Sequence, residues 1–149
     1  MVHVSGLRNL GWVTGRGSAN RTDVRFGIHG TDLGIPWDNG RGEVLIAFGD
    51  TYGEGWGGDG AGPQAADWRW NVLARSTTGD LSGGIVLDDV VRRQDGLAAQ
   101  ILPHDDKVTE HTVIPTSGIA IGGRNYLHYM SIRQWGVPGG WRTNHGGIV

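Results

Sequence analysis

Hydrophobic residues occur along this chain in short runs that are rich in β-branched side chains and bounded by Gly, Pro, Asn or Asp. Runs of this length and composition are typical of β-strands. The predicted strands cover residues 44–48, 71–74, 84–91, 108–116, 119–121 and 126–132. The window 90–102 has the best helical spacing, but Gly96 interrupts it, so a short helix there is left as an alternative. The pattern therefore predicts an all-β fold.

A β-hairpin is predicted around Asn39-Gly40, a dipeptide that suits a two-residue type I′ turn. This turn would make residues 31–35 and 43–51 antiparallel neighbours. Pairing about the turn carries Asp32 and Asp50 toward the same edge of the sheet. The glycine-rich segment 53–67 follows directly, either as a surface loop or as a flap over a site.

Composition narrows the class of protein. The 149 residues suffice for one domain, taken as 1–149, and the 28 glycines and 7 tryptophans favour many tight turns between strands over disorder. The formal net charge of -2, with both signs interspersed, argues against a nucleic-acid partner. No apolar run reaches the roughly 18 residues of a membrane span. Six histidines without metal-ligand spacing and the lack of cysteine predict no metal and no cofactor, although the acidic segments 88–89 and 104–106 leave a calcium site open.

Asp32 and Asp50 are the leading candidates for chemistry. Each carboxyl group stands in an otherwise apolar strand, where an unpaired charge is costly. Glycoside hydrolysis uses two carboxyl groups, one to protonate the leaving oxygen and one as nucleophile or base. In a poorly solvated cleft the pKa values of such a pair are pushed apart, which separates the acid from the base. The alternative is that each carboxylate caps a turn.

Further polar and aromatic residues are candidates for contact with a substrate. Arg69 and Asn71 alternate with tryptophans and so share one face of a strand, where they would bind sugar hydroxyls or, alternatively, pair with carboxylates. Glu110 is a candidate for an additional acid, and Trp37 and Trp56 are candidates for platforms on which a sugar ring stacks, with structural packing as the alternative for both tryptophans. Thr116 and His128 complete the predicted substrate contacts, with a purely structural histidine as the alternative for His128.

Five sequence motifs carry a family resemblance. They are GTDLGIPWDNG (30–40), AFGDTYG (47–53), WRWNVLARS (68–76), TVIPTSGIAIGGRNYLHYMSIRQWG (112–136) and PGGWRTNHGGIV (138–149). In this order they resemble domain-of-unknown-function family 4185, which belongs to actinobacteria and their phages and is associated with endo-D-arabinanases; the resemblance runs from Val13 onward. It implies a five-bladed β-propeller with a carbohydrate site at one mouth of its axis, and Asp32 and Asp50 as the catalytic pair. Only the N-terminal half of such a propeller is expected here, completed by further chain or by self-association with a partner copy.

The residues and the resemblance together predict a glycoside hydrolase. Its expected reaction is cleavage of D-arabinofuranosyl linkages in actinobacterial cell-wall arabinan, as found in arabinogalactan and lipoarabinomannan. The alternative is a non-catalytic carbohydrate-binding protein, or a phage tail or virion structural protein, on the same fold. A polysaccharide is the expected partner in the first two cases, and the cell envelope, the extracellular space or a phage virion is the favoured location.

Overall fold

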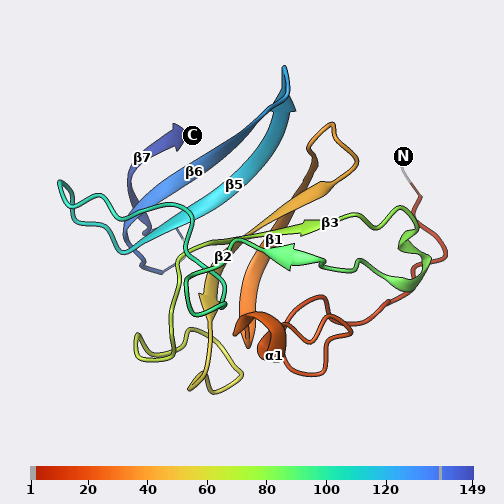
Figure 1. Ribbon diagram of the computed structural model, residues 1–149. Coiled ribbons are helices and arrows are strands. Elements are labelled where there is room, and N and C mark those ends of the chain that lie inside the picture. Colours follow the sequence, from red (N-terminus) through yellow and green to blue (C-terminus); the bar gives the residue numbers. More distant parts are fainter. Residues whose placement is uncertain (1–2, 138) are drawn as a thin grey trace.

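The chain folds into two antiparallel sheets and one short helix (Figure 1). The computed structural model describes residues 3–137 and 139–149, so Pro138, which opens the last of the five motifs, lies outside the described residues. The helix is α1 (Thr22–Phe26), and a single 3-10 turn, η1, covers Leu81–Gly83. The first sheet contains, in spatial order, β1 (Gly30–Asp38), β2 (Val44–Tyr52), β3 (Val72–Ser76) and β4 (Asp89–Val90). The second sheet contains β5 (Thr112–Ile121), β6 (Arg124–Gln134) and β7 (Arg142–Ile148).

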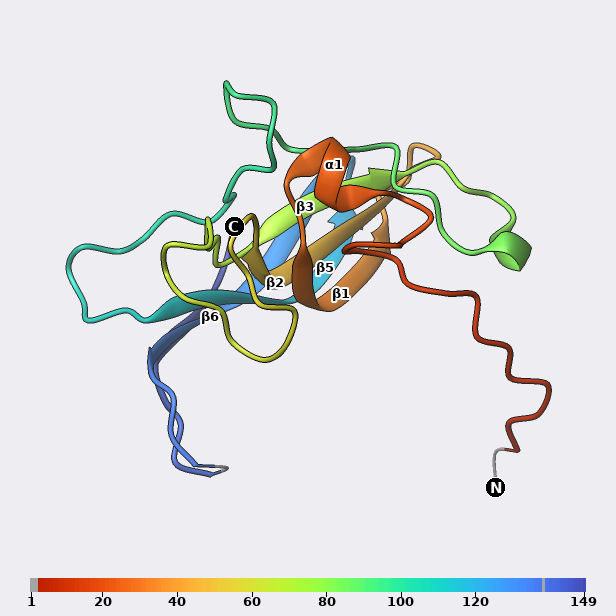
Figure 2. The ribbon, with the colours of Figure 1, turned by 90° about the horizontal axis from the view of Figure 1, so that it is seen from below.

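Strand β2 is buried on both faces, which explains why its sequence VLIAF is continuously apolar rather than alternating. Ile46 and Phe48 point to one side and pack with Phe26 of α1 in a first core. Ala47 points to the other side, into a second core between the two sheets. Figure 2 shows this layering, with α1 on one side of the first sheet and the second sheet on the other. The second core contains Trp37, Ala47, Leu102, Val113 and Leu127.

The predicted hairpin forms, but its turn is longer than predicted. Strands β1 and β2 pair antiparallel, with Thr31 opposite Thr51. The connection is five residues, 39–43, closed by a 2.9 Å hydrogen bond from the Asn39 N–H to the Glu43 carbonyl, so the two-residue turn was wrong. The physical reason is that the Asn39 side chain accepts the backbone N–H groups of Arg41 and Glu43 and thereby holds a wider loop.

Several other element predictions need correction. In the predicted strand 84–91 only Asp89–Val90 is strand, and it belongs to the first sheet. The predicted strands 108–116 and 119–121 are one strand, β5, which begins only at Thr112 and contains an irregularity between Pro115 and Ser117. Residues 91–102 contain no helix; turns and an isolated bridge between Arg92 and Ala98 occupy that segment. Helix α1 was not predicted, because five residues are too few to show helical periodicity.

The all-β prediction is confirmed, and neither of the two sheets is closed among the described residues. Each sheet is an up-and-down meander, the connectivity of a propeller blade. The count of five blades and the half-propeller interpretation remain predictions. No helix within residues 3–137 and 139–149 is both long and apolar enough to span a membrane.

Candidate functional site

A β-bulge places the Asp32 carboxyl group over the β2 backbone at Gly49 and Asp50. Thr31 lies opposite Thr51, and Leu33 lies opposite Phe48. Between these two pairs β1 has one residue, Asp32, whereas β2 has two, Gly49 and Asp50. Asp32 therefore lies opposite both Gly49 and Asp50. Bulges of this kind re-aim side chains near functional sites. A Cβ atom at Gly49 would lie 2.3 Å from the Asp32 Oδ1 atom. Position 49 therefore has to be glycine for the Asp32 side chain to lie where it does.

Asp32 and Asp50 line one cavity of about 280 Å³, together with Tyr52, Trp56 and the backbone around Gly60. The cavity lies where β1 begins and β2 ends, at the lower end of the molecule in Figure 1, beside the loop 53–67. The Tyr52 ring is stacked against Trp56 on one side, with ring centroids 6.2 Å apart, and against Trp68 on the other, at 6.1 Å. The two acids thus face a wall of aromatic rings.

Asp32 holds its proton more tightly than an ordinary aspartate. Burial raises its pKa from 3.8 to about 6, and repulsion from the Asp50 carboxylate adds to this. The backbone N–H of Asp50 donates to the Asp32 carboxylate and opposes the rise. The residue as a whole is exposed, although its carboxyl group lies over Gly49 of β2. Asp32 is therefore a carboxyl group that is substantially protonated at mildly acidic pH.

Asp50 has a different set of neighbours, which favour its ionised form. Burial raises its pKa above 3.8, and two hydrogen bonds to its Oδ1 atom counteract the rise. The Thr112 hydroxyl donates at 2.8 Å and the indole N–H of Trp68 donates at 3.0 Å. The neighbouring His111 side chain also lowers the pKa of Asp50. Because Thr112 begins β5, the site is built from both sheets.

Neither carboxyl group of this pair forms an ion pair with lysine or arginine within the part of the chain that the structure describes. The Arg–carboxylate ion pairs there use other acids, namely Asp67, Glu43, Asp89 and Asp95. The Tyr52 hydroxyl lies near both carboxyl groups, and burial first and the charge of Asp50 next raise its pKa, so it stays protonated and can donate. Two acids without cationic partners beside a neutral donor are groups that can give a proton to a bound molecule or take one from it.

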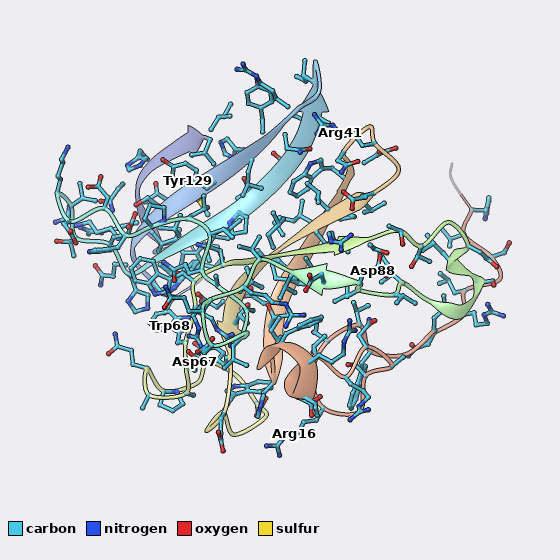
Figure 3. All side chains as sticks on the ribbon, viewed as in Figure 1. Arg16, Arg41, Asp67, Trp68, Asp88 and Tyr129 are labelled. Atoms are coloured by element: carbon cyan, nitrogen blue, oxygen red, sulfur yellow. The ribbon has the colours of Figure 1, made fainter. Side chains whose placement is uncertain are left out.

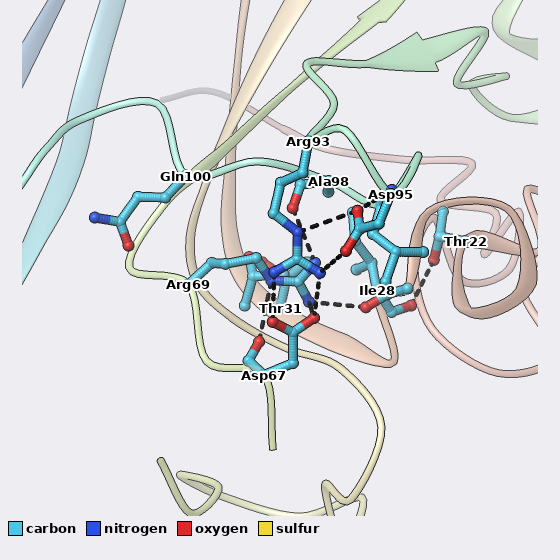
Figure 4. A network of polar contacts seen from close by, with 12 residues as sticks. Thr22, Ile28, Thr31, Asp67, Arg69, Arg93, Asp95, Ala98 and Gln100 are labelled. Carbon is cyan, nitrogen blue, oxygen red and sulfur yellow. Dashed lines mark hydrogen bonds and ion pairs between the residues drawn. The ribbon is translucent and has the colours of Figure 1, made fainter. Parts of the chain in front are cut away.

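Arg69 and Asn71 do not line the cavity, and the strand face that they were predicted to share does not form, because residues 68–71 contain only the isolated bridge at Arg69. Arg69 is 3% exposed, and its guanidinium donates to the carbonyls of Gly27 and Ala98 at 2.7 and 3.2 Å. Figure 4 shows this guanidinium beside Asp67, whose carboxylate also binds Arg93. Asn71 is fully buried and bonds three backbone groups, the N–H of Ile101, the N–H of Leu102 and the carbonyl of Val113.

The other predicted substrate contacts also lie apart from the acid pair. Trp37 is 8% exposed and packs between the sheets against Gly118. Thr116 and His128 bond each other on exposed positions of β5 and β6. The Glu110 side chain is buried in a separate hollow of about 290 Å³. Tyr129 lines the same hollow, and Figure 3 labels it on the second sheet, well away from Trp68. Their roles as substrate contacts stay predictions.

The Glu110 carboxylate is fully engaged by protein groups. One oxygen accepts the Asp105 N–H at 2.9 Å and lies 3.3 Å from the His104 imidazole, and the other accepts the Ser131 hydroxyl. These bonds tie the loop before β5 to β6. Among the described residues no group of three or more His, Cys, Asp or Glu side chains is arranged to hold a metal ion.

Sequence reasoning missed four residues around the acid pair, which are Tyr52, Trp68, His111 and Thr112. Tyr52 was available from the strand period, because residues two apart on a strand share a face. Trp68 was not, since its position depends on the bridge between Thr51 and Arg69, which adds a short extra strand pairing to the end of β2. His111 and Thr112 come from the second sheet, and nothing in the local sequence indicates their approach to Asp50.

Comparison with known proteins decides the family. The family model described as "Domain of unknown function (DUF4185)" matches residues 17–149. The chain belongs to the DUF4185 family. Among curated proteins, this DUF4185 chain is similar to "Notoamide biosynthesis cluster protein J" of Aspergillus sp. (strain MF297-2), with 32% identity over 146 residues. It is equally similar to "Notoamide biosynthesis cluster protein J'" of Aspergillus versicolor, with 32% identity over 144 residues.

The matched region covers 89% of the DUF4185 chain but only 37% and 38% of these two fungal relatives. The chain therefore spans less than two fifths of the length of the curated relatives that it matches. The match extends over both sheets and includes Asp32, Asp50 and Thr112 within the family model.

Proposed function

We propose that this chain carries the acid pair of a glycoside hydrolase that cleaves D-arabinofuranosyl linkages in a cell-wall arabinan. The observation that carries the proposal is that Asp32 and Asp50 line one cavity but have different hydrogen-bond partners. Hydrolysis of a glycosidic bond needs two carboxyl groups in opposite protonation states. Arabinan as the substrate rests on the resemblance of the five motifs to the arabinanase-associated family.

Asp32 is the general acid in this proposal. Its pKa of about 6 leaves it protonated at mildly acidic pH, and its position at the cavity mouth suits contact with a departing sugar oxygen. When the bond between the anomeric carbon and the leaving oxygen breaks, Asp32 gives its proton to that oxygen. Raising the pH through about 6 removes this proton, so kcat/KM falls on the alkaline side.

Asp50 supplies the carboxylate. The bonds from Thr112 and Trp68 stabilise its negative charge and counteract the rise that burial causes in its pKa, so the proposal assigns the ionised role to Asp50 and the protonated role to Asp32. It attacks the anomeric carbon directly or takes a proton from an attacking water, and the configuration of the first product distinguishes these two routes. The Tyr52 hydroxyl and the Trp56 ring form the facing wall, where an apolar sugar face and its hydroxyls can both be bound.

The test compares Asp32→Asn, Asp50→Asn and the control Asp38→Asn, which is an exposed aspartate at the far end of β1. Purified protein is incubated with arabinogalactan, and new reducing ends are counted. Each site variant should lose about 10²–10⁴-fold in kcat, the usual contribution of a general acid or base. A substrate with a 4-nitrophenyl leaving group, which departs without a proton, should restore Asp32→Asn but not Asp50→Asn. Wild-type turnover by both site variants would refute the proposal.

A non-catalytic carbohydrate-binding role is the second candidate. It is favoured by the exposure of Asp32 at the mouth of the cavity, because a widely open site admits water and weakens acid catalysis. The same incubation separates the two roles. A binding role alone would be supported if the wild-type chain binds arabinogalactan saturably and releases no new reducing ends. The same result is required of a longer protein that contains this chain and extends over the full length of its relatives.

A further inference from the structure

A second cavity adjoins the acid pair and has no role in the site described so far. Its volume is about 420 Å³, and its walls include Trp12, Arg16 and His29. It shares Gly30, Thr31 and Trp56 with the cavity of Asp32 and Asp50. The Trp56 ring lies directly on Gly30, where a Cβ atom would be 2.1 Å from its Cζ3 atom. Trp56 is thus a common wall with one cavity on each side.

The segment that closes this second cavity is held in place by buried hydrogen bonds. The Gly15 N–H donates to the Thr22 hydroxyl at 2.8 Å, and that hydroxyl donates to the Ile28 carbonyl at 3.0 Å. Gly15 has a φ of +87°, and a Cβ atom there would lie 2.8 Å from the His29 carbonyl oxygen. Only glycine permits this approach. Gly15 is therefore held against the beginning of β1, and Figure 3 shows the adjoining Arg16 at this lower end of the molecule.

The lining combines aromatic faces with hydrogen-bond donors and contains no carboxylate. Trp12 is 72% exposed, an unusual position for so large an apolar ring. Arg16 adds a guanidinium with several donors. An indole face beside such donors suits a sugar ring, which has an apolar face and a rim of hydroxyl groups.

We propose that this cavity binds the sugar residue next to the one whose bond is cleaved, so that one polysaccharide chain occupies both sides of Trp56. The proposal rests on the proposed function for its substrate class. It assigns Trp12 as the stacking platform of the neighbouring sugar and Arg16 as a donor to its hydroxyls.

Binding is measured by calorimetry in the Asp50→Asn background, which removes the carboxylate that cleavage requires. The probe is a linear D-arabinofuranosyl hexasaccharide. Trp12→Ala should weaken its binding about three- to tenfold, the magnitude of one aromatic contact, and Arg16→Ala should weaken it by a similar factor. Trp12→Phe should restore most of the affinity. The control is Trp141→Ala, since Trp141 is 55% exposed and packs against Trp135 in a different part of the chain.

The outcomes separate this proposal from the proposed function. Unchanged affinity in both Trp12→Ala and Arg16→Ala would overturn the neighbouring subsite, whereas release of reducing ends by the wild-type chain would still support hydrolysis. Binding that depends on Trp12 without any release of reducing ends would support the subsite and refute the hydrolase. Failure of the Asp50→Asn protein and of the wild-type chain to bind the hexasaccharide would overturn both.

Discussion

The substitution Gly49→Ala tests the geometry of the acid pair without touching either acid. Its new Cβ atom would lie 2.3 Å from the Asp32 Oδ1 atom, 3.3 Å from the Asp32 Cγ atom and 3.0 Å from a methyl carbon of Leu33. All three are side-chain atoms, and Gly49 does not need a positive φ, so the β2 backbone itself tolerates alanine. To reach even a tight contact, the Asp32 carboxyl oxygen has to move by roughly 0.7–1 Å.

A displacement of this size predicts a large kinetic effect. Misplacing a catalytic group by about 1 Å costs on the order of 10²-fold in rate, so Gly49→Ala should lower kcat/KM about 100-fold. Most of the loss should fall on kcat, because the substitution leaves unchanged the aromatic walls that are proposed to bind the sugar. The free energy of unfolding should change by no more than about 1 kcal/mol, since alanine in a strand also removes the entropic cost of glycine.

The measurement is kcat/KM for release of reducing ends from arabinogalactan, with thermal unfolding as the check on folding. Gly79→Ala is the matched control, because a Cβ atom there meets nothing within 4 Å. Gly49→Ala protein that is folded and retains activity within twofold of wild type would refute the reasoning. Global unfolding of this variant would refute it as well, since the collision is with side chains at the cavity mouth and not with the backbone.

Three further predictions concern the charges of the site and its frame. The pKa of Asp32 is about 6 in the folded protein and 3.8 is its ordinary value, so the free energy of unfolding falls as pH rises through that interval. Asp32→Asn removes this penalty and should therefore raise Tm at pH 7 more than at pH 4. Equal Tm shifts at the two pH values would contradict the assignment. Thr112→Val removes a bond that lowers the pKa of Asp50, so the acidic limb of the pH–activity profile should move to higher pH, and an unmoved limb would contradict that bond. In Arg69→Lys, the lysine ammonium cannot replace the bonds of the guanidinium to both buried carbonyls, so the free energy of unfolding should fall by about 2–4 kcal/mol in a denaturant titration. The control Arg75→Lys changes a surface ion pair and should lower the free energy of unfolding by less than about 1 kcal/mol.

The convergence of Asp32 and Asp50 could be predicted from the sequence, because one hairpin contains both. The Asn39-Gly40 turn signal and the two flanking apolar segments fixed the pairing of β1 with β2, even though the loop is five residues rather than two. The bulge at Gly49 could not be predicted, since an extra residue in one strand leaves no mark on the alternation of polar and apolar positions. The opposing wall was equally hidden, because Thr112 lies 62 residues from Asp50 in the chain.

The assignment of Arg69 shows what strand alternation can and cannot tell. Alternation in WRWN predicts one shared face for Arg69 and Asn71, but the segment is not a strand beyond the bridge at Arg69, and the two side chains bond Gly27 and Val113 on different sides of the first sheet. Alternation also does not say which side of the segment is open. The bridge to Thr51 decides this, because it aligns Trp68 with Asp50 and turns Arg69 inward to the carbonyls of Gly27 and Ala98.

A polar side chain in a strand is therefore judged by whether its partners are already present. The guanidinium of Arg69 is satisfied by main-chain carbonyls and by Asp67, so it supports the frame of the fold. The carboxyl groups of Asp32 and Asp50 line one cavity and form no ion pair with lysine or arginine among the described residues, and burial followed by repulsion from Asp50 raises the pKa of Asp32. Such an arrangement is unfavourable for the fold alone, since two unpaired acids destabilise each other when both are charged. It becomes favourable once a bound molecule accepts a proton from one acid and faces the charge of the other, which is the arrangement that hydrolysis of a glycosidic bond requires.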